Sequence, residues 1–308
     1  MATSTMYAGN FPSNETVNLR STPNGTVLVR IPYGRTVEVI DYNVASTWSQ
    51  ATYEGTSGYI MTKFLVDSDP YQNVPSASFT VGHLGKTNTT QVKVRKQPST
   101  SAGHYGNVVK GSTFYIEGVV SGTSLNGSTD WVKIRYGTSA GGSKNAYIHS
   151  SYFTDIGVAP STAKQRCIKI AKSLDKNTEA NLGLGGDCCQ MFIYWLCGAC
   201  GLTVSQMPYG TNTCGPARNY FIDTHGSWQD WSSSCLPKEG DLVYYGTVHA
   251  STSNHVGLVV SIDTSAKTYT SIECNLSDKV KKCIGNYSTG YCATNNKYIQ
   301  GFARPTWI

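Results

Sequence analysis

Two adjacent cysteines, a histidine and two polar residues could together carry out nucleophilic chemistry. Cys188 and Cys189 open an apolar run, His255 opens a second, and Glu273 and Asn275 close a third. A thiol becomes a strong nucleophile when an imidazole takes its proton, and a carboxylate or amide on the other ring nitrogen orients that imidazole. The residue types and their order therefore predict a cysteine hydrolase.

The first cysteine of the pair is expected at the start of a buried helix. Gly183–Gly186 breaks the chain, Asp187 is a suitable N-cap, and residues 191–196 are apolar on all sides. Unpaired N–H groups and the helix dipole favour a thiolate in the first turn over a thiol with a free pKa of about 8.5. The sequence therefore predicts Cys188 as the nucleophile.

The histidine and its partners are expected on neighbouring antiparallel strands. Apolar residues alternate after His255 over 256–262, so one face packs and the other can present the imidazole to a cleft. Residues 269–275 form the next predicted strand, where Glu273 and Asn275 share a face. Either could hold the second imidazole nitrogen.

The other histidines and thiols of this region have ordinary explanations. His225 and His249 lie in polar loop sequences without strand alternation, so solvent-exposed positions are expected. Cys197 and Cys200 have the spacing of half a metal site, but no matching second pair follows. Their place late in an apolar helix favours buried core thiols.

Cysteines are confined to one part of the chain. All ten lie between Cys167 and Cys292, and such a number is typical of disulfides formed in an oxidising compartment. One catalytic thiol leaves an odd number, so at least some thiols are expected to be free.

Composition predicts a globular protein of two or three domains. The chain has 308 residues, 39% of them apolar and 14% charged. Its net charge of +6 has no dense basic run, which is compatible with an anionic polymer such as a cell wall and argues against a nucleic-acid surface. No stretch of about 18 apolar residues predicts a membrane span. Met1–Phe11 has neither the basic region nor the apolar core of a Sec signal peptide.

Residues 16–66 and 90–153 repeat one pattern. Short β-branched and aromatic runs alternate with Gly, Pro, Asn and Ser turns, as in small antiparallel barrels. Both copies resemble bacterial SH3 domains: Val-x-Leu-Arg at 17–20 matches Val-x-Val-Arg at 92–95, and each copy has a central Trp and a closing Tyr-Ile strand. The resemblance implies wall-peptide binding or support of a catalytic domain, and we expect support. Linkers are expected at Asp67–Ser78 and Asp155–Ser161.

The last part of the chain, about residues 160–308, resembles the NlpC/P60 peptidase family. The matching segments are Asp-Cys-Cys-Gln at 187–190, Pro-Lys-Glu-Gly-Asp-Leu at 237–242 and His-Val-Gly-Leu at 255–258. The family writes Asp-Cys-Ser-Gly at the first, so Cys189 and Gln190 are departures, and the motif position gives Cys188. The Glu-x-Asn pair at 273–275 instead resembles the CHAP family, which shares the papain-like fold.

The resemblances imply an α+β fold class: two small SH3-like β-barrels, at 1–70 and 79–156, followed by a papain-like NlpC/P60 α+β catalytic domain at 160–308. They imply a peptidoglycan hydrolase, a cysteine D,L-endopeptidase that cuts the stem peptide at γ-D-glutamyl–diamino acid.

The same resemblances imply residue roles and partners. Cys188 attacks, His255 is the base, Asn275 or Glu273 orients it, and Asp187 receives the free amino end of the stem peptide. The expected partner is peptidoglycan stem peptide or cell wall, with no nucleic acid, no cofactor and no metal. A secreted or wall-associated monomer is expected. The alternatives are a CHAP-like N-acetylmuramoyl-L-alanine amidase and a catalytically inactive wall-binding protein.

Overall fold

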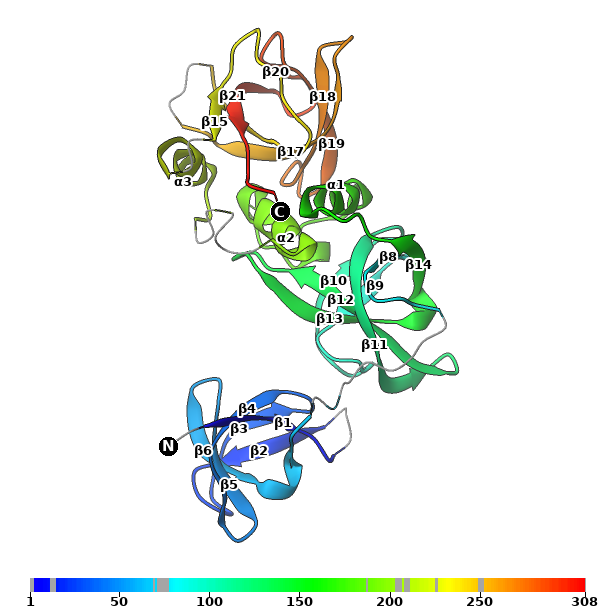
Figure 1. The fold of residues 1–308 in the computed structure, drawn as a ribbon, viewed down its shortest axis with the longest axis vertical. Coiled ribbons are helices and arrows are strands. Elements are labelled where there is room, and N and C mark those ends of the chain that lie inside the picture. The colour runs from blue at the N-terminus through cyan, green and yellow to red at the C-terminus, as the bar shows by residue number, and fades with distance from the viewer. Residues whose placement is uncertain are drawn as a thin grey trace.

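The described part of the chain is mostly β, with three sheets in succession and three short α-helices beside the third sheet (Figure 1). The computed structural model describes residues 3–11, 15–68, 70, 78–186, 188–202, 207, 211–224, 227–248 and 252–307. Within these ranges no helix is long and apolar enough to cross a membrane.

The first two sheets have the same antiparallel strand order. The first runs β3-β2-β6-β5-β4-β1-β7, and adding seven to each number gives the second, β10-β9-β13-β12-β11-β8-β14. Two copies of one sequence pattern predict such a repeat of topology. The strands of the first sheet are β1 (Ser4–Ala8), β2 (Thr16–Arg20), β3 (Val27–Pro32), β4 (Thr36–Ala45), β5 (Trp48–Tyr53), β6 (Thr56–Met61) and β7 (Leu65–Val66). Those of the second are β8 (His83–Thr87), β9 (Val92–Arg95), β10 (His104–Val108), β11 (Thr113–Leu125), β12 (Ser128–Gly137), β13 (Ser143–His149) and β14 (Phe153–Val158).

Strand β14 corrects the expected linker at Asp155–Ser161. The strand continues to Val158 and pairs antiparallel with β8. The Asp155 carboxylate accepts hydrogen bonds from His83 Nδ1 at 2.8 Å and from the Thr80 N–H at 3.0 Å. Asp155, which the sequence pattern places in a linker, therefore stabilises the edge of the second sheet.

The third sheet closes on itself. Strand β20 pairs with both β19 and β21, so β21, β16, β17, β18, β19 and β20 form a six-stranded barrel, with β15 added at β21. Its strands are β15 (Trp228–Asp230), β16 (Leu242–Gly246), β17 (His255–Asp263), β18 (Thr268–Glu273), β19 (Lys281–Asn286), β20 (Tyr291–Cys292) and β21 (Lys297–Ala303).

Helix boundaries follow from the local sequence. Helix α1 (Ala163–Ser173) begins after Thr162, whose Oγ1 accepts a hydrogen bond from the Gln165 N–H at 3.3 Å and so caps the helix. Helix α2 (Cys189–Cys200) ends at Gly201, whose φ of 88° is the left-handed geometry that glycine tolerates. Helix α3 (Cys214–Asn219) follows.

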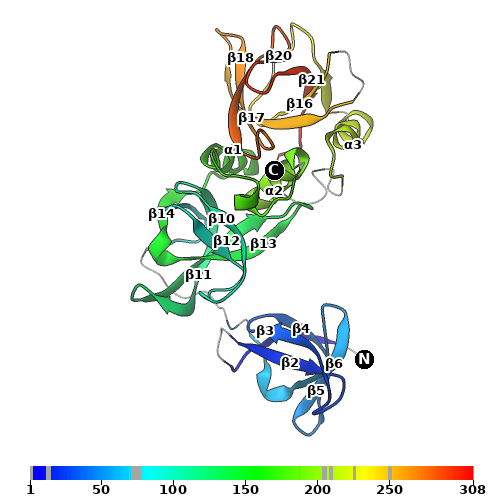
Figure 2. The same cartoon turned by 180° about the vertical axis from the view of Figure 1, so that it is seen from behind.

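Helix α2 lies between the second sheet and the barrel (Figure 2). Its buried side chains Phe192 and Trp195 belong to one apolar core that includes Phe114 of β11 and Val256 of β17. The first sheet has a separate core. The second sheet is therefore part of the hydrophobic support of the helix that carries the adjacent cysteines.

Candidate active site

A buried histidine–glutamate pair forms the centre of the site. His255 opens β17, as the sequence predicted, and Glu273 closes β18, two residues before the predicted end of that strand; these two strands are neighbours in the barrel. His255 Nε2 lies 2.9 Å from Glu273 Oε2, with the histidine 3% exposed and the glutamate fully buried. The imidazole is thus oriented by a carboxylate through one ring nitrogen.

Three further side chains hold the carboxylate in place. Glu273 Oε1 accepts hydrogen bonds from Tyr245 Oη at 2.7 Å and Ser271 Oγ at 2.5 Å, and Oε2 accepts one from Asn295 Nδ2 at 2.8 Å. Burial acts to raise the pKa of Glu273, but the contacts with His255, Ser271 and Tyr245 outweigh it and lower that pKa.

The sequence analysis missed these three residues. Tyr245 and Ser271 have a usable signal: Tyr245 lies opposite His255 on β16, and Ser271 is two residues before Glu273 on the same strand face. Asn295 carries no such signal, because it follows β20 in a turn.

Asn275 lies beyond the end of β18. Its φ of 65° is left-handed, so the strand does not continue through it and the face that it was expected to share with Glu273 is lost. Of the two expected partners of His255, Glu273 makes the contact with Nε2.

The thiol that meets His255 is that of Cys189. This residue is the first of α2, and its Sγ lies 3.2 Å from Sγ of Cys214. Its thiol interacts with His255, and the interaction lowers the pKa of Cys189 and raises that of His255. Because Nε2 of the imidazole is engaged by Glu273, Nδ1 is the nitrogen left for the thiol. The His255 imidazole therefore interacts with both the Cys189 thiol and the Glu273 carboxylate.

This environment favours a thiolate–imidazolium pair. The hydrogen bond from Cys214 lowers the pKa of the Cys189 thiol against the effect of burial, and His255 lowers it further. Burial acts to lower the pKa of His255, but the contacts with Cys189 and Glu273 raise it to about 9. Both shifts stabilise the charged forms.

Cys188 lies in the opposite environment. It is the N-cap residue of α2, a position that the sequence predicted for Asp187, and its Sγ lies 2.9 Å from Sγ of Cys274. Cys274, burial and Glu179 all raise the pKa of the Cys188 thiol. The structure thus brings Cys189, and not Cys188, to the histidine.

Glu179, Cys188 and Cys274 form a second buried cluster. Their oxygen and sulfur atoms lie within 4.8 Å of one another, a donor set that could take a soft divalent ion. A structural zinc site needs four ligands, and no further His, Cys, Asp or Glu joins this group in the described ranges. We assign no ion to it.

The remaining expectations divide into two groups. Asp187, His225 and His249 lie outside the described residues. Cys197 and Cys200 are buried in α2, which confirms their interpretation as core thiols.

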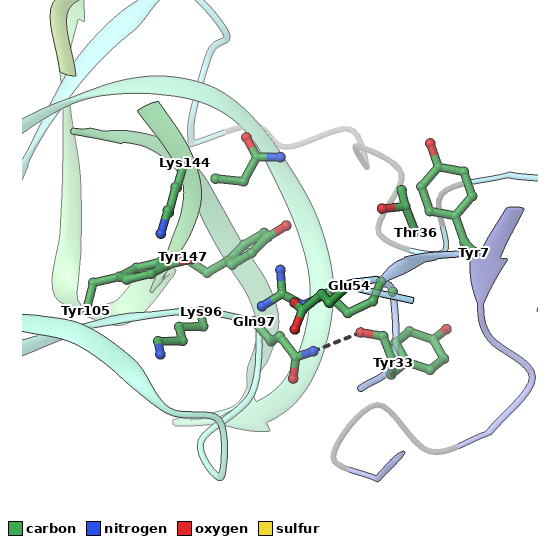
Figure 3. Close-up of a pocket in the computed structure, with 12 residues that line it drawn as sticks. Tyr7, Tyr33, Thr36, Glu54, Lys96, Gln97, Tyr105, Lys144 and Tyr147 are labelled. Atoms are coloured by element: carbon green, nitrogen blue, oxygen red, sulfur yellow. Dashed lines mark hydrogen bonds between the residues drawn. The ribbon is translucent and has the colours of Figure 1, made fainter. Parts of the chain in front are cut away.

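A cavity of about 590 Å³ lies elsewhere. It is lined by residues of the first two β-rich repeats, among them Tyr33, Lys96 and Tyr147 (Figure 3). Gln97 Nε2 donates a hydrogen bond to the Tyr33 carbonyl across it at 2.9 Å. Neither Cys189 nor His255 lines this cavity. The candidate active site is therefore assigned from the reactive side chains and not from the volume of a cavity.

Several solved NlpC/P60 structures are similar to this chain. NlpC1 from Trichomonas vaginalis has 13% sequence identity and a TM-score of 0.32, over 100% of this chain and 94% of that one. An NlpC/P60 family protein from Bacillus cereus ATCC 10987 has 12% identity and a TM-score of 0.36, over 98% and 99%. An NlpC/P60 endopeptidase from Photobacterium damselae subsp. piscicida has 13% and 0.28, over 96% and 65%.

Sequence comparison gives no match. No family model matches the chain, and no curated protein matches it. Because these identities and TM-scores are low, the solved structures assign no role to individual residues. Such roles are argued from the geometry described above.

Proposed function

We propose that the chain is a cysteine peptidase of bacterial cell walls, with Cys189 as nucleophile, His255 as base and Glu273 as the orienting group. The observation that carries the proposal is that His255 is held by the buried Glu273 carboxylate and interacts with the Cys189 thiol, which lowers the pKa of that thiol. The nucleophile is thus one residue beyond Cys188, which the motif predicted.

Each group has a definite task in acyl transfer. The Cys189 thiolate attacks the scissile carbonyl, and the His255 imidazolium donates its proton to the leaving amine. Glu273 holds the imidazole and stabilises its charge. The first N–H groups of α2 have no acceptor within the helix, so the N–H of Cys189 is a suitable donor to the oxyanion.

The proposed bond is the γ-D-glutamyl–diamino acid bond of the stem peptide, as the sequence resemblance to NlpC/P60 enzymes implies. One of the similar solved structures is named as an NlpC/P60 endopeptidase. Asp187 is proposed, from the sequence motif alone, to receive the free amino end of the peptide.

One observation favours the CHAP-like amidase as a second candidate. The residue on His255 Nε2 is Glu273, and a glutamate after the histidine is the feature that resembles CHAP enzymes. Such an enzyme cuts between the sugar and L-alanine with the same three groups, so the bond is a separate question from the mechanism.

The first two sheets are proposed to be SH3-like modules with different tasks. The second shares a core with α2 and so supports the catalytic helix, whereas the first has its own core. Support by the second module is compatible with wall binding by the first.

Digestion of purified walls by a matched pair of variants tests the proposal. Cys189→Ser should lower the rate by about a thousandfold or more, whereas Cys188→Ser should keep most of it. Mass spectrometry of the products identifies the bond: a new N-terminal diamino acid supports the endopeptidase, and a new L-alanine amine supports the amidase. Absence of products from the wild type would contradict both and favour a wall-binding protein.

A further inference from the structure

Two thiols meet where two helices begin. Cys189 is the first residue of α2 and Cys214 is the first of α3, and their Sγ atoms lie 3.2 Å apart. The sulfurs need to approach by only about 1 Å to reach the disulfide bond length of about 2.05 Å. Both side chains are nearly buried, with 7% and 4% of their surface exposed.

The two thiols differ in reactivity. Cys189 has the contact with His255 that favours its thiolate, which is the form that reacts with oxidants. The pKa of Cys214 is raised, first because the Cys189 sulfur is next to it and then because it is buried. Cys214 therefore remains a protonated thiol beside a reactive thiolate, which is the arrangement of a resolving cysteine.

Cys188 and Cys274 form a separate close pair of thiols. Their Sγ atoms lie 2.9 Å apart, and neither thiol is among the groups that shift the pKa of Cys189 or of His255. Among the described thiols, Cys214 is the one that contacts Cys189. A disulfide between Cys188 and Cys274 would leave the proposed nucleophile free.

We infer that Cys189 and Cys214 are a redox site, which a peroxide converts into a reversible intramolecular disulfide. The inference rests on the proposed function, because it takes Cys189 as the nucleophile. The disulfide blocks hydrolysis, and it also keeps the nucleophile from irreversible oxidation to the sulfinic acid.

The chemistry balances with hydrogen peroxide as the oxidant. The Cys189 thiolate attacks one peroxide oxygen, the O–O bond breaks, and the departing hydroxide takes a proton from His255 to leave as water. Cys214 sulfur then attacks the sulfenic sulfur, the S–O bond breaks, and the oxygen leaves as a second water with the Cys214 proton. Two thiols are oxidised to one disulfide, and one peroxide is reduced to two waters.

The test treats the full-length protein with hydrogen peroxide and then with dithiothreitol. Peptide mapping under non-reducing conditions should find Cys189 linked to Cys214, and activity should fall in parallel with that species and return on reduction. The activity of Cys214→Ser is expressed relative to its own starting value. The loss of activity that dithiothreitol cannot reverse should be about tenfold faster in this variant than in the wild type. Cys274→Ser is the matched control and should respond as the wild type does.

The outcomes separate the inference from the proposed function. Absence of a Cys189–Cys214 linkage after peroxide, or recovery of Cys214→Ser as complete as that of the wild type, would overturn the redox site. A linkage that forms while wall hydrolysis continues would instead show that Cys189 is not the nucleophile. Linkage together with reversible loss supports both.

Discussion

Two adjacent thiols at the start of one helix have opposite chemical environments. The Cys189 thiol meets an imidazole held by a carboxylate, which favours the thiolate, whereas Cys188 faces Cys274 and Glu179, which disfavour it. The difference arises because successive residues at a helix start point in different directions. A shift of one residue along the chain therefore determines which thiol is reactive.

The pH dependence follows from the two pKa shifts. Hydrolysis needs the Cys189 thiolate, whose pKa is lowered, and the His255 imidazolium, whose pKa is raised to about 9. We expect kcat/KM to stay high between these two ionisations and to fall as pH rises through about 9. Cys188→Ser should give the same profile. A rate that begins to rise only near the free thiol pKa of about 8.5 would contradict the ion pair.

Replacing the buried carboxylate tests the orienting role of Glu273. In Glu273→Gln the negative charge beside His255 is lost, and an amide group must face donors from Tyr245 and Asn295. We expect the pKa of His255, followed by NMR, to fall, and kcat to drop by about a hundredfold or more. In Asn275→Ala the pKa of His255 should change little. The reverse pattern would transfer the orienting role to Asn275.

The sequence was sufficient to predict the strand that His255 opens, but not to choose between neighbouring residues. Alternation after His255 and the position of Glu273 predict strands that the structure confirms. The choice of thiol depends on where α2 begins, and helix ends are decided by tertiary contacts as well as by capping residues. Asn275 illustrates the same point, since its left-handed backbone ends a strand that the pattern would extend.

At the scale of elements, α2 is held by unusually close backbone contacts. A Cβ at Gly198 would lie 1.8 Å from the Gly142 carbonyl oxygen, and one at Gly137 would lie 1.8 Å from the Trp195 carbonyl oxygen. The hairpin of β12 and β13 therefore rests directly on the helix backbone. Sequence alone gives no indication of this contact, because it joins residues far apart in the chain.

The prediction for this contact concerns stability. Gly198→Ala should improve local helix propensity by up to about 1 kcal/mol, yet the clash with the Gly142 carbonyl should make the net effect a loss of about 1–3 kcal/mol. Urea unfolding measures it. Gly185→Ala, where nothing lies within 4 Å of the added Cβ, is the control and should change stability little. Equal stability of the two variants would contradict the close packing.

The boundaries of the two sequence repeats do not coincide with the boundaries of the hydrophobic cores. The two repeats have one strand order, but the second shares its core with the helices and the barrel, whereas the first does not. The pattern of strands and turns predicts the repeat because each copy is formed by neighbouring residues in the sequence. The shared core could not be predicted, because strand and helix patterns show which face is apolar and not which partner covers it.

Truncation tests this division. A fragment of residues 78–308 keeps the shared core, so it should unfold cooperatively and retain hydrolysis of soluble stem peptides. A fragment of residues 160–308 exposes the face of α2 that Phe114 and Tyr136 cover in the full chain, and should be unfolded or aggregated. Circular dichroism with thermal melting distinguishes these results. A stable, active 160–308 fragment would contradict the supporting role of the second sheet.

Alkylation of the folded protein tests whether Cys189 is the activated thiol, and it needs no substrate. A substoichiometric dose of iodoacetamide near pH 6.5 should react with the activated thiolate first, and peptide fragmentation between Cys188 and Cys189 assigns the label. We expect carboxamidomethyl Cys189, with the reaction strongly slowed in His255→Ala. A label on Cys188, or an unchanged rate in His255→Ala, would contradict activation of Cys189 by His255.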